Sequence, residues 1–177
     1  MRRFSMIAAS FIAWSVSAPA QAQTFGPPIP GMCLLSRMGA INASRAGQTM
    51  RAMLGQMQTS LNGELAQRRG ALEQQRRLLE TRQNATAPIE YQRQLAAIDQ
   101  QAQLLEQQQN ARFIAAQTQS QQQIDHALNN ALARVVTRAA CSLVLDRDHS
   151  YGWNNAMDVT AAVTKEMDTI LPSVVLQ

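Results

Sequence analysis

The chain has 177 residues, of which 46% are apolar, 16% charged and only 5% aromatic. We therefore expect one domain with few aromatic side chains in its core. Fifteen of the sixteen basic residues are arginine, twelve residues are acidic, and the net charge is +4. No dense basic patch with interleaved aromatics is present, which argues against a nucleic-acid partner, and two His with two Cys exclude a multi-cysteine zinc cluster.

The first 22 residues have the pattern of an export signal. Arg2 and Arg3 precede a short apolar run from Met6 to Val16, and small residues lead to an A-x-A cleavage sequence that ends at Ala22. The run is much shorter than the roughly 20 residues of a membrane-spanning helix. We therefore expect cleavage after Ala22, with an uncleaved anchor as the alternative. The mature protein would have a net charge of +2 and be soluble and outside the cytoplasm.

A short irregular leader and an apolar segment follow. Five Gly and Pro residues between positions 26 and 31 fit neither a helix nor a central strand. The apolar run from Met32 to Ile41 is interpreted as a strand of a small body.

The middle of the chain predicts two long helices. From Ser44 to about Ala140, Gln, Ala, Leu and Arg dominate, and apolar residues recur at alternating spacings of four and three, the seam pattern of a coiled coil. The segment Asn84–Pro88 interrupts this pattern, because proline cannot lie inside a helix. We expect helices at about 44–83 and 88–139 that run antiparallel and protrude as an arm.

Glycines recur inside the first predicted helix at positions 47, 55, 63 and 70. Each costs about 1 kcal/mol relative to alanine in a helix interior. We interpret them as a source of bending in the arm, and the alternatives are close packing between the two helices or mere tolerance of glycine.

The last segment predicts a second strand and a terminal helix. The strand is expected at Cys141–Leu145. Asp158 or Thr160 is expected to cap the helix and Pro172 to end it, with a buried stripe formed by Ala162, Val163, Met167, Ile170 and Leu171. The predicted fold class is α+β: residues 23–43 and 140–177 form a small β-rich body with a terminal helix, and residues 44–139 form an inserted antiparallel coiled-coil hairpin.

Cys33 and Cys141 are 108 positions apart in a chain expected to reach an oxidising compartment. The hairpin returns the chain to its starting point, so the two predicted strands flank its base. We predict an intrachain disulfide between these cysteines, and two small buried thiols are the alternative.

Residues with catalytic potential do not form a recognisable site. Asp146, Asp148 and His149 lie close together, but so tight a group is more typical of a turn than of a metal or acid–base centre. Ser142 lacks a nucleophile-elbow sequence, and no glycine-rich phosphate loop is present. We expect no enzymatic activity, no catalytic residue, no metal and no cofactor.

The order of these segments resembles the Skp/OmpH family of periplasmic chaperones. The resemblance rests on Ala46-Gly47 at the start of the long helix, on Leu143-Val144-Leu145-Asp146, and on Asp158-Val159-Thr160 followed by Val163. It implies a homotrimer whose bodies associate through a β-barrel. Three hairpins would then enclose a cavity that holds unfolded outer-membrane proteins and prevents their aggregation without ATP.

Client binding is predicted along the arm, because scattered apolar side chains on flexible helices bind many sequences weakly. Three methionines where the first helix leaves the body are candidates, although they could instead pack the seam and the trimer neck. The predicted set is Met50, Met53, Met57, Leu61, Leu72, Leu79, Tyr91, Leu95 and Phe113. The alternative function is a coiled-coil spacer or scaffold of the cell envelope. Peripheral contact with a membrane surface is also left open.

Overall fold

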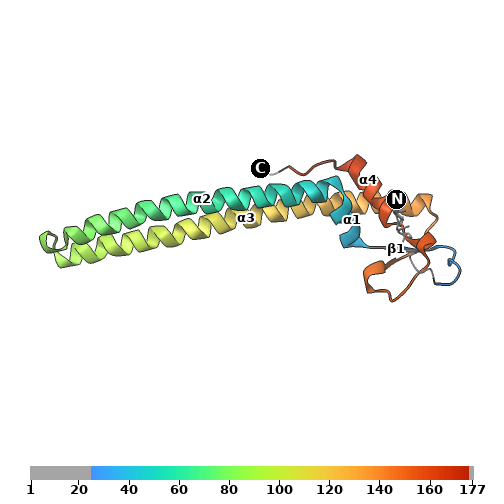
Figure 1. The fold of residues 1–177 in the computed structure, drawn as a ribbon, viewed down its shortest axis with the longest axis horizontal. Helices are drawn as coiled ribbons and strands as arrows, with labels where there is room; N and C mark the ends of the chain where they lie inside the picture. Colours follow the sequence, from blue (N-terminus) through green and yellow to red (C-terminus); the bar gives the residue numbers. More distant parts are fainter. Residues whose placement is uncertain (1–24, 176–177) are drawn as a thin grey trace, which may run out of the picture.

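The computed structural model describes residues 25–175, so the predicted signal sequence lies outside the described residues. The chain is mostly helical with a small two-stranded sheet, an α+β arrangement (Figure 1). In chain order the elements are β1 (Met32–Leu35), α1 (Arg37–Ala43), α2 (Arg45–Thr81), α3 (Pro88–Arg138), β2 (Leu143–Asp146) and α4 (Thr160–Ile170). Single turns of 3-10 helix lie at Gln83–Ala85, Arg147–His149 and Asn155–Met157.

Helices α2 and α3 form a long arm that extends away from a small body (Figure 1). They lie side by side and run in opposite directions, joined by the turn at residues 82–87. Pro88 is the first residue of α3, where its missing N–H removes no helical hydrogen bond. Ala87 just before it has the extended ψ of 135° that a residue before proline prefers.

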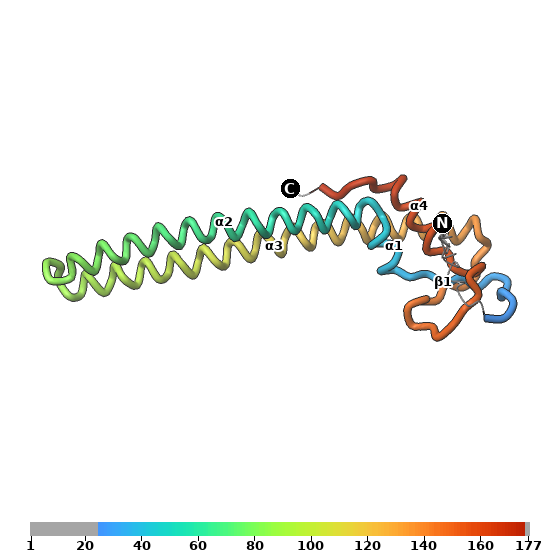
Figure 2. Tube along the Cα trace, viewed as in Figure 1, coloured from blue at the N-terminus to red at the C-terminus, as the bar shows by residue number. Residues whose placement is uncertain are grey.

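Described segments from before and after the arm build the body (Figure 2). Strands β1 and β2 pair in parallel, from Met32 opposite Leu143 to Leu35 opposite Asp146. Leu34 also forms an isolated bridge with Asp158, so β1 has neighbours on both sides while β2 has one within the described chain.

One hydrophobic core joins the body to the base of the arm. Helix α3 contributes every third or fourth side chain near its end, which is the spacing of a single helix face. The buried core residues are Cys33, Leu35, Ala40, Ile41, Ala46, Ile124, Leu128, Ala131, Val135, Val159, Val163, Met167 and Val174. The described helices include none that is long and apolar enough to cross a bilayer.

The predicted strand from Met32 to Ile41 is wrong beyond Leu35. Ser36 ends the strand and begins helix α1, because its hydroxyl accepts a hydrogen bond from the Gly39 N–H at 2.8 Å. Ala40 and Ile41 are buried on one face of α1. An apolar run therefore concealed a change from strand to helix.

Four further details of the body differ from the predictions. Strand β2 starts at Leu143 and not at Cys141, because Ala140 has a left-handed φ of 52° and the Ser142 N–H bonds to the Gly31 carbonyl at 2.7 Å. Val159 is the N-cap of α4, and Ala162 is exposed because Val163 and Met167 face the core. With two four-residue strands among the described residues, the body contains less β structure than predicted.

Candidate functional site on the helical arm

A shallow groove follows one flank of the arm between α2 and α3. Two adjoining hollows form it, and Gln101 lines both. The residues that line the groove are Arg68, Ala71, Leu72, Gln75, Leu78, Leu79, Arg82, Thr86, Gln94, Ala97, Ile98, Gln101, Leu104, Leu105 and Gln108. We call this surface the arm groove.

Two leucines leave apolar surface open to solvent in the arm groove. Leu78 is 59% exposed and Leu104 is 46% exposed, whereas their neighbours Leu79 and Leu105 are buried in the seam at 8% and 7%. Successive helical residues point about 100° apart, so only one leucine of each pair can face the opposite helix. The other is left available to a partner.

Charged pairs hold the opposite flank of the seam. Arg69 pairs with Glu106, and Arg76 pairs with Asp99, across the two helices. Residues just before and just after a seam position point to opposite flanks of a helix. These pairs therefore lie on the other side of Leu72 and Ile98 from the arm groove.

The polar groups of the arm groove are mainly uncharged amides. Gln75, Gln94, Gln101 and Gln108 are exposed, and each can donate and accept hydrogen bonds at once. Arg68 and Arg82 are the charged lining residues, and neither forms an ion pair with a residue in the range 25–175. Gln94 donates to Glu90 at 2.9 Å. Apolar side chains beside exposed amides suit an unfolded segment, which presents both apolar groups and unpaired backbone groups.

The structure places much of the predicted client-binding set in the seam. Leu61 and Leu79 are buried between the helices. Leu72, Tyr91, Leu95 and Phe113 are half-buried. Leu72 and Leu79 contribute to the floor of the arm groove.

The three predicted methionines lie at the base of the arm. Met50 and Met53 pack against the body core, and Met57 is half-buried. The first two therefore contribute to the packing of the core at the base of the arm.

Sequence reasoning missed Leu78 and Leu104, as well as two exposed isoleucines, Ile89 near the turn and Ile114 on α3. The signal for the two leucines was present as the doublets Leu78-Leu79 and Leu104-Leu105. Only one leucine of each doublet can pack in a regular seam. The second member was therefore a candidate for a surface role.

The four glycines of α2 have two different environments. A Cβ atom at Gly47 would lie 1.9 Å from the Ile41 carbonyl oxygen, so Gly47 permits the close approach of α1 and α2. At Gly55, Gly63 and Gly70 a Cβ atom would meet no heavy atom within 4 Å. Helix packing thus accounts for Gly47 and not for the other three.

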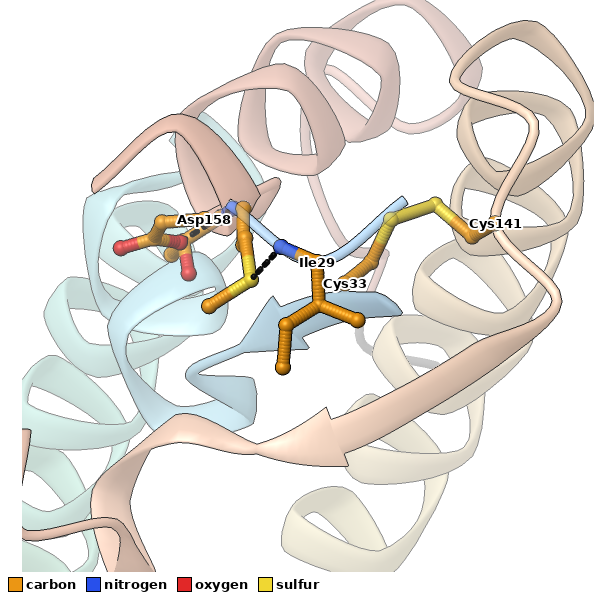
Figure 3. Close-up of a disulfide and its surroundings, with 6 residues drawn as sticks. Ile29, Cys33, Cys141 and Asp158 are labelled. Atoms are coloured by element: carbon orange, nitrogen blue, oxygen red, sulfur yellow. Dashed lines mark hydrogen bonds between the residues drawn. A yellow bond between two sulfur atoms is a disulfide. The ribbon is translucent and has the colours of Figure 1, made fainter. Parts of the chain in front are cut away.

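A disulfide joins Cys33 of β1 to Cys141, just beyond the end of α3 (Figure 3). Their Cα atoms are 5.8 Å apart. Close by, the Ile29 N–H bonds to the Met157 sulfur at 3.3 Å, which ties the leader to the turn before α4. The disulfide fixes the base of the arm against the sheet.

The charged groups of the body serve structural roles. The Arg147 guanidinium donates to Asp158 at 2.8 Å and stacks over the Trp153 ring, 5.6 Å from its centre. Burial alone would raise the pKa of Asp158, but hydrogen bonds from Thr160 and Arg147 outweigh burial and hold it below the ordinary value. The same bond to Asp158 raises the pKa of Arg147, so both groups are charged at neutral pH.

The cluster of Asp146, Asp148 and His149 forms turn contacts. Asp146 accepts from the Asp148 N–H at 2.8 Å and pairs with His149 Nδ1 at 2.8 Å, which lowers the pKa of Asp146. Asp148 accepts from the Ser36 hydroxyl at 2.6 Å. Across residues 25–175, no group of three or more His, Cys, Asp or Glu side chains is arranged to hold a metal ion.

Comparisons with known proteins were made against families, curated proteins and solved structures. A family profile described as "Outer membrane protein (OmpH-like)" matches residues 33–167. A crystal structure of a proposed outer membrane chaperone (OmpH-like) from Caulobacter crescentus CB15 aligns with a TM-score of 0.75 and 25% identity, over 88% of this chain and 94% of that chain. The search of curated proteins gave no match.

Proposed function

This chain belongs to the family of OmpH-like outer membrane proteins, and we propose that it is a periplasmic chaperone that holds unfolded outer-membrane proteins without ATP. The structural relative from Caulobacter crescentus, itself described as a proposed outer membrane chaperone, supports this role. The observation that carries the proposal is the arm groove, where exposed Leu78 and Leu104 lie among uncharged glutamines.

The chemistry of the arm groove suits weak binding of many sequences. Fixing the backbone of one client residue costs about 1–2 kcal/mol, so a chaperone of this kind gains by leaving its client mobile. Fully burying a leucine side chain is worth about 1.5–3 kcal/mol. About half of the surface of Leu78 and of Leu104 is exposed, so burying that half against a client can contribute about 1 kcal/mol at each position. Many such contacts, and no single dominant one, would hold the client.

A homotrimer is part of the proposal, because it would bring three arms around one client. Strand β2 has one neighbour within the described chain, and its Leu143 and Leu145 side chains are 49% and 40% exposed. A free strand edge with exposed apolar residues favours pairing with another chain. Light scattering without client should give the mass of three chains, and a monodisperse monomer would contradict this assembly.

The test of function is suppression of aggregation when an unfolded outer-membrane β-barrel protein is diluted from urea. Wild-type protein should keep light scattering low at about one trimer per client. The double variant Leu78→Ala with Leu104→Ala should bind the client roughly 20–30-fold more weakly, since about 1 kcal/mol at each position corresponds to about fivefold in affinity. Alanine keeps the helix and removes only the exposed side chain.

Ile114→Ala is the matched control. Ile114 lies on the same arm and is as exposed as Leu78, at 59%, but it does not line the arm groove. Its replacement should leave client affinity unchanged. If the Ile114 variant loses affinity and the double variant does not, the arm groove is not the client site. If wild-type protein gives no protection, the chaperone role itself is wrong and the spacer role gains support.

A further inference from the structure

The chain that follows α4 docks back onto the base of the arm. Over residues 171–175 it has neither helix nor strand structure and runs along the arm away from the body (Figures 1 and 2). Val174 is only 3% exposed and belongs to the core cluster, whereas Ser173 and Val175 on either side are exposed. Val174 anchors the far end of this segment, which we call the tail, and Leu171 packs against the core at its start.

Gln123 of α3 binds the tail through backbone groups. Its side-chain amide donates to the Val175 carbonyl oxygen at 2.8 Å and accepts from the Val175 N–H at 3.1 Å. A neighbouring strand makes the same two bonds to a residue in a hydrogen-bonded pair of an antiparallel sheet. These two bonds of Gln123 contact only the backbone of Val175, so they do not depend on which side chain this residue carries.

The surroundings of Gln123 complete a small peptide site. The next residue of α3, Ile124, is fully buried in the same core cluster as Val174, so the amide of Gln123 lies at the rim of an apolar site. The site takes one small branched apolar side chain and, one residue later, a free backbone N–H and C=O. We call it the Gln123 site.

We propose that the Gln123 site binds extended segments of client polypeptides and that the tail of this chain occupies it until a client competes. The proposal rests on the chaperone function above. The strands of outer-membrane β-barrels alternate apolar and polar residues, and before folding their backbone groups are unpaired. Such a strand presents the pattern that the tail shows here, one buried apolar residue between two exposed ones.

The tail is covalently linked to α4, and this link determines which clients can compete with it for the Gln123 site. A segment linked through a short flexible connection has an effective concentration of about millimolar. A free weakly binding peptide will not displace the tail, whereas a client already held in the arm groove reaches a similar local concentration. The Gln123 site therefore adds a contact at the base of the arm for a client that is bound along it.

The test uses a fluorescent peptide with the sequence of residues 169–177 and measures its anisotropy against four proteins. The full chain should bind it weakly, because its own tail fills the site. A variant that lacks residues 172–177 should bind it at least tenfold more tightly. Gln123→Ala in that shortened variant should lose most of the gain. Gln122→Ala, at the exposed neighbouring position, is the matched control and should keep it.

The shortened variant loses a buried valine, so its folding is checked by circular dichroism. If it does not fold, the full chain with Val174→Ser and Gln123→Ala is compared with the full chain carrying Val174→Ser alone. Only the latter should bind the peptide more tightly than wild type. A folded variant without its tail that fails to bind the peptide, or that binds equally well with Gln123→Ala, overturns the inference.

The same variants separate this inference from the proposed function. In the aggregation assay the shortened variant should protect a β-barrel client at a lower protein concentration than wild type. If it binds the peptide but protects no better, the site is not used by clients and the inference is wrong, while the chaperone role stands. If wild-type protein protects no client, the proposed function is wrong, and the peptide assay still reports on the site.

Discussion

Replacing Gly55, Gly63 and Gly70 by alanine should stabilise the arm. A Cβ atom at each position meets no heavy atom within 4 Å, so the substitution adds no clash. Each change should gain about 1 kcal/mol from helix propensity. The three glycines are seven or eight residues apart, or about 10–12 Å along the helix, far enough for their effects to add. The triple variant should therefore gain about 3 kcal/mol in free energy of unfolding.

The same substitution at Gly47 should have the opposite sign. A Cβ atom there would lie 1.9 Å from the Ile41 carbonyl oxygen, which is backbone and cannot rotate away. Helix α1 would have to move, at a cost of about 1–3 kcal/mol or more. Gly47→Ala is therefore the internal control for the triple variant.

Urea unfolding followed by circular dichroism measures both effects, and the aggregation assay measures their consequence. A stiffer arm should protect small clients as wild type does and protect the largest clients less well. If the triple variant is no more stable than wild type, the packing argument is refuted. Equal protection of all clients by a stabilised triple variant would show that bending of the arm is not used.

Three other changes test the body and the arm. Replacing Cys33 and Cys141 by alanine should lower the free energy of unfolding by about 4–5 kcal/mol, because the disulfide closes a loop of 108 residues; an unchanged urea midpoint would contradict this. Hydrogen bonds hold the pKa of Asp158 below the ordinary value of 3.8. The charged carboxylate therefore contributes fully to the free energy of unfolding at neutral pH, and this contribution is lost as the pH falls through 3.8 and below. Asp158→Asn should thus be less stable than wild type at pH 7, with the difference closing in acid, and a difference that persists in acid would argue against this assignment. Removing two turns, about seven residues, from each helix around Asn84–Pro88 should keep the trimer and lower the largest client size protected; unchanged protection of large clients would make the arms scaffolding.

The long helices were predictable because their signals are local and repeated. The four-three spacing of apolar residues and the proline at position 88 depend on nothing outside the segment. The bounds of α2 and α3 lie within two residues of the predicted ones. The pairing of Cys33 with Cys141 also followed from the return of the chain to the base of the arm.

The body was harder to predict because its local signals conflict. Met32–Ile41 is mostly apolar, and the Ser36 side-chain cap, which accepts from the Gly39 N–H, separates strand from helix. Ala162 has the composition of a core residue, but the packing of α4 on α3 through Val163 and Met167 leaves it outside. Such choices depend on tertiary contacts that a single sequence does not state.

The predicted client-binding residues and the arm groove lie on the same two helices, but most of the predicted residues are buried or half-buried at the seam. The four-three spacing of apolar residues selects side chains that face the opposite helix. Such residues, for example Leu61 and Leu79, are buried by that helix. A partner can contact only side chains that the seam leaves exposed, and on the arm these include Leu78 and Leu104. The contacts of Gln123 with the tail join residues 52 positions apart and have no sequence signature at all.

The most direct test of the central claim is site-specific photo-crosslinking to an unfolded β-barrel client. A photoreactive residue replaces Gln101, which lies where the two hollows of the arm groove adjoin, or Ile114, which lies outside them. Strong client crosslinks from position 101 and weak ones from position 114 are expected. Equal crosslinking from both positions, or crosslinks from position 114 alone, would contradict the claim that the arm groove holds the client.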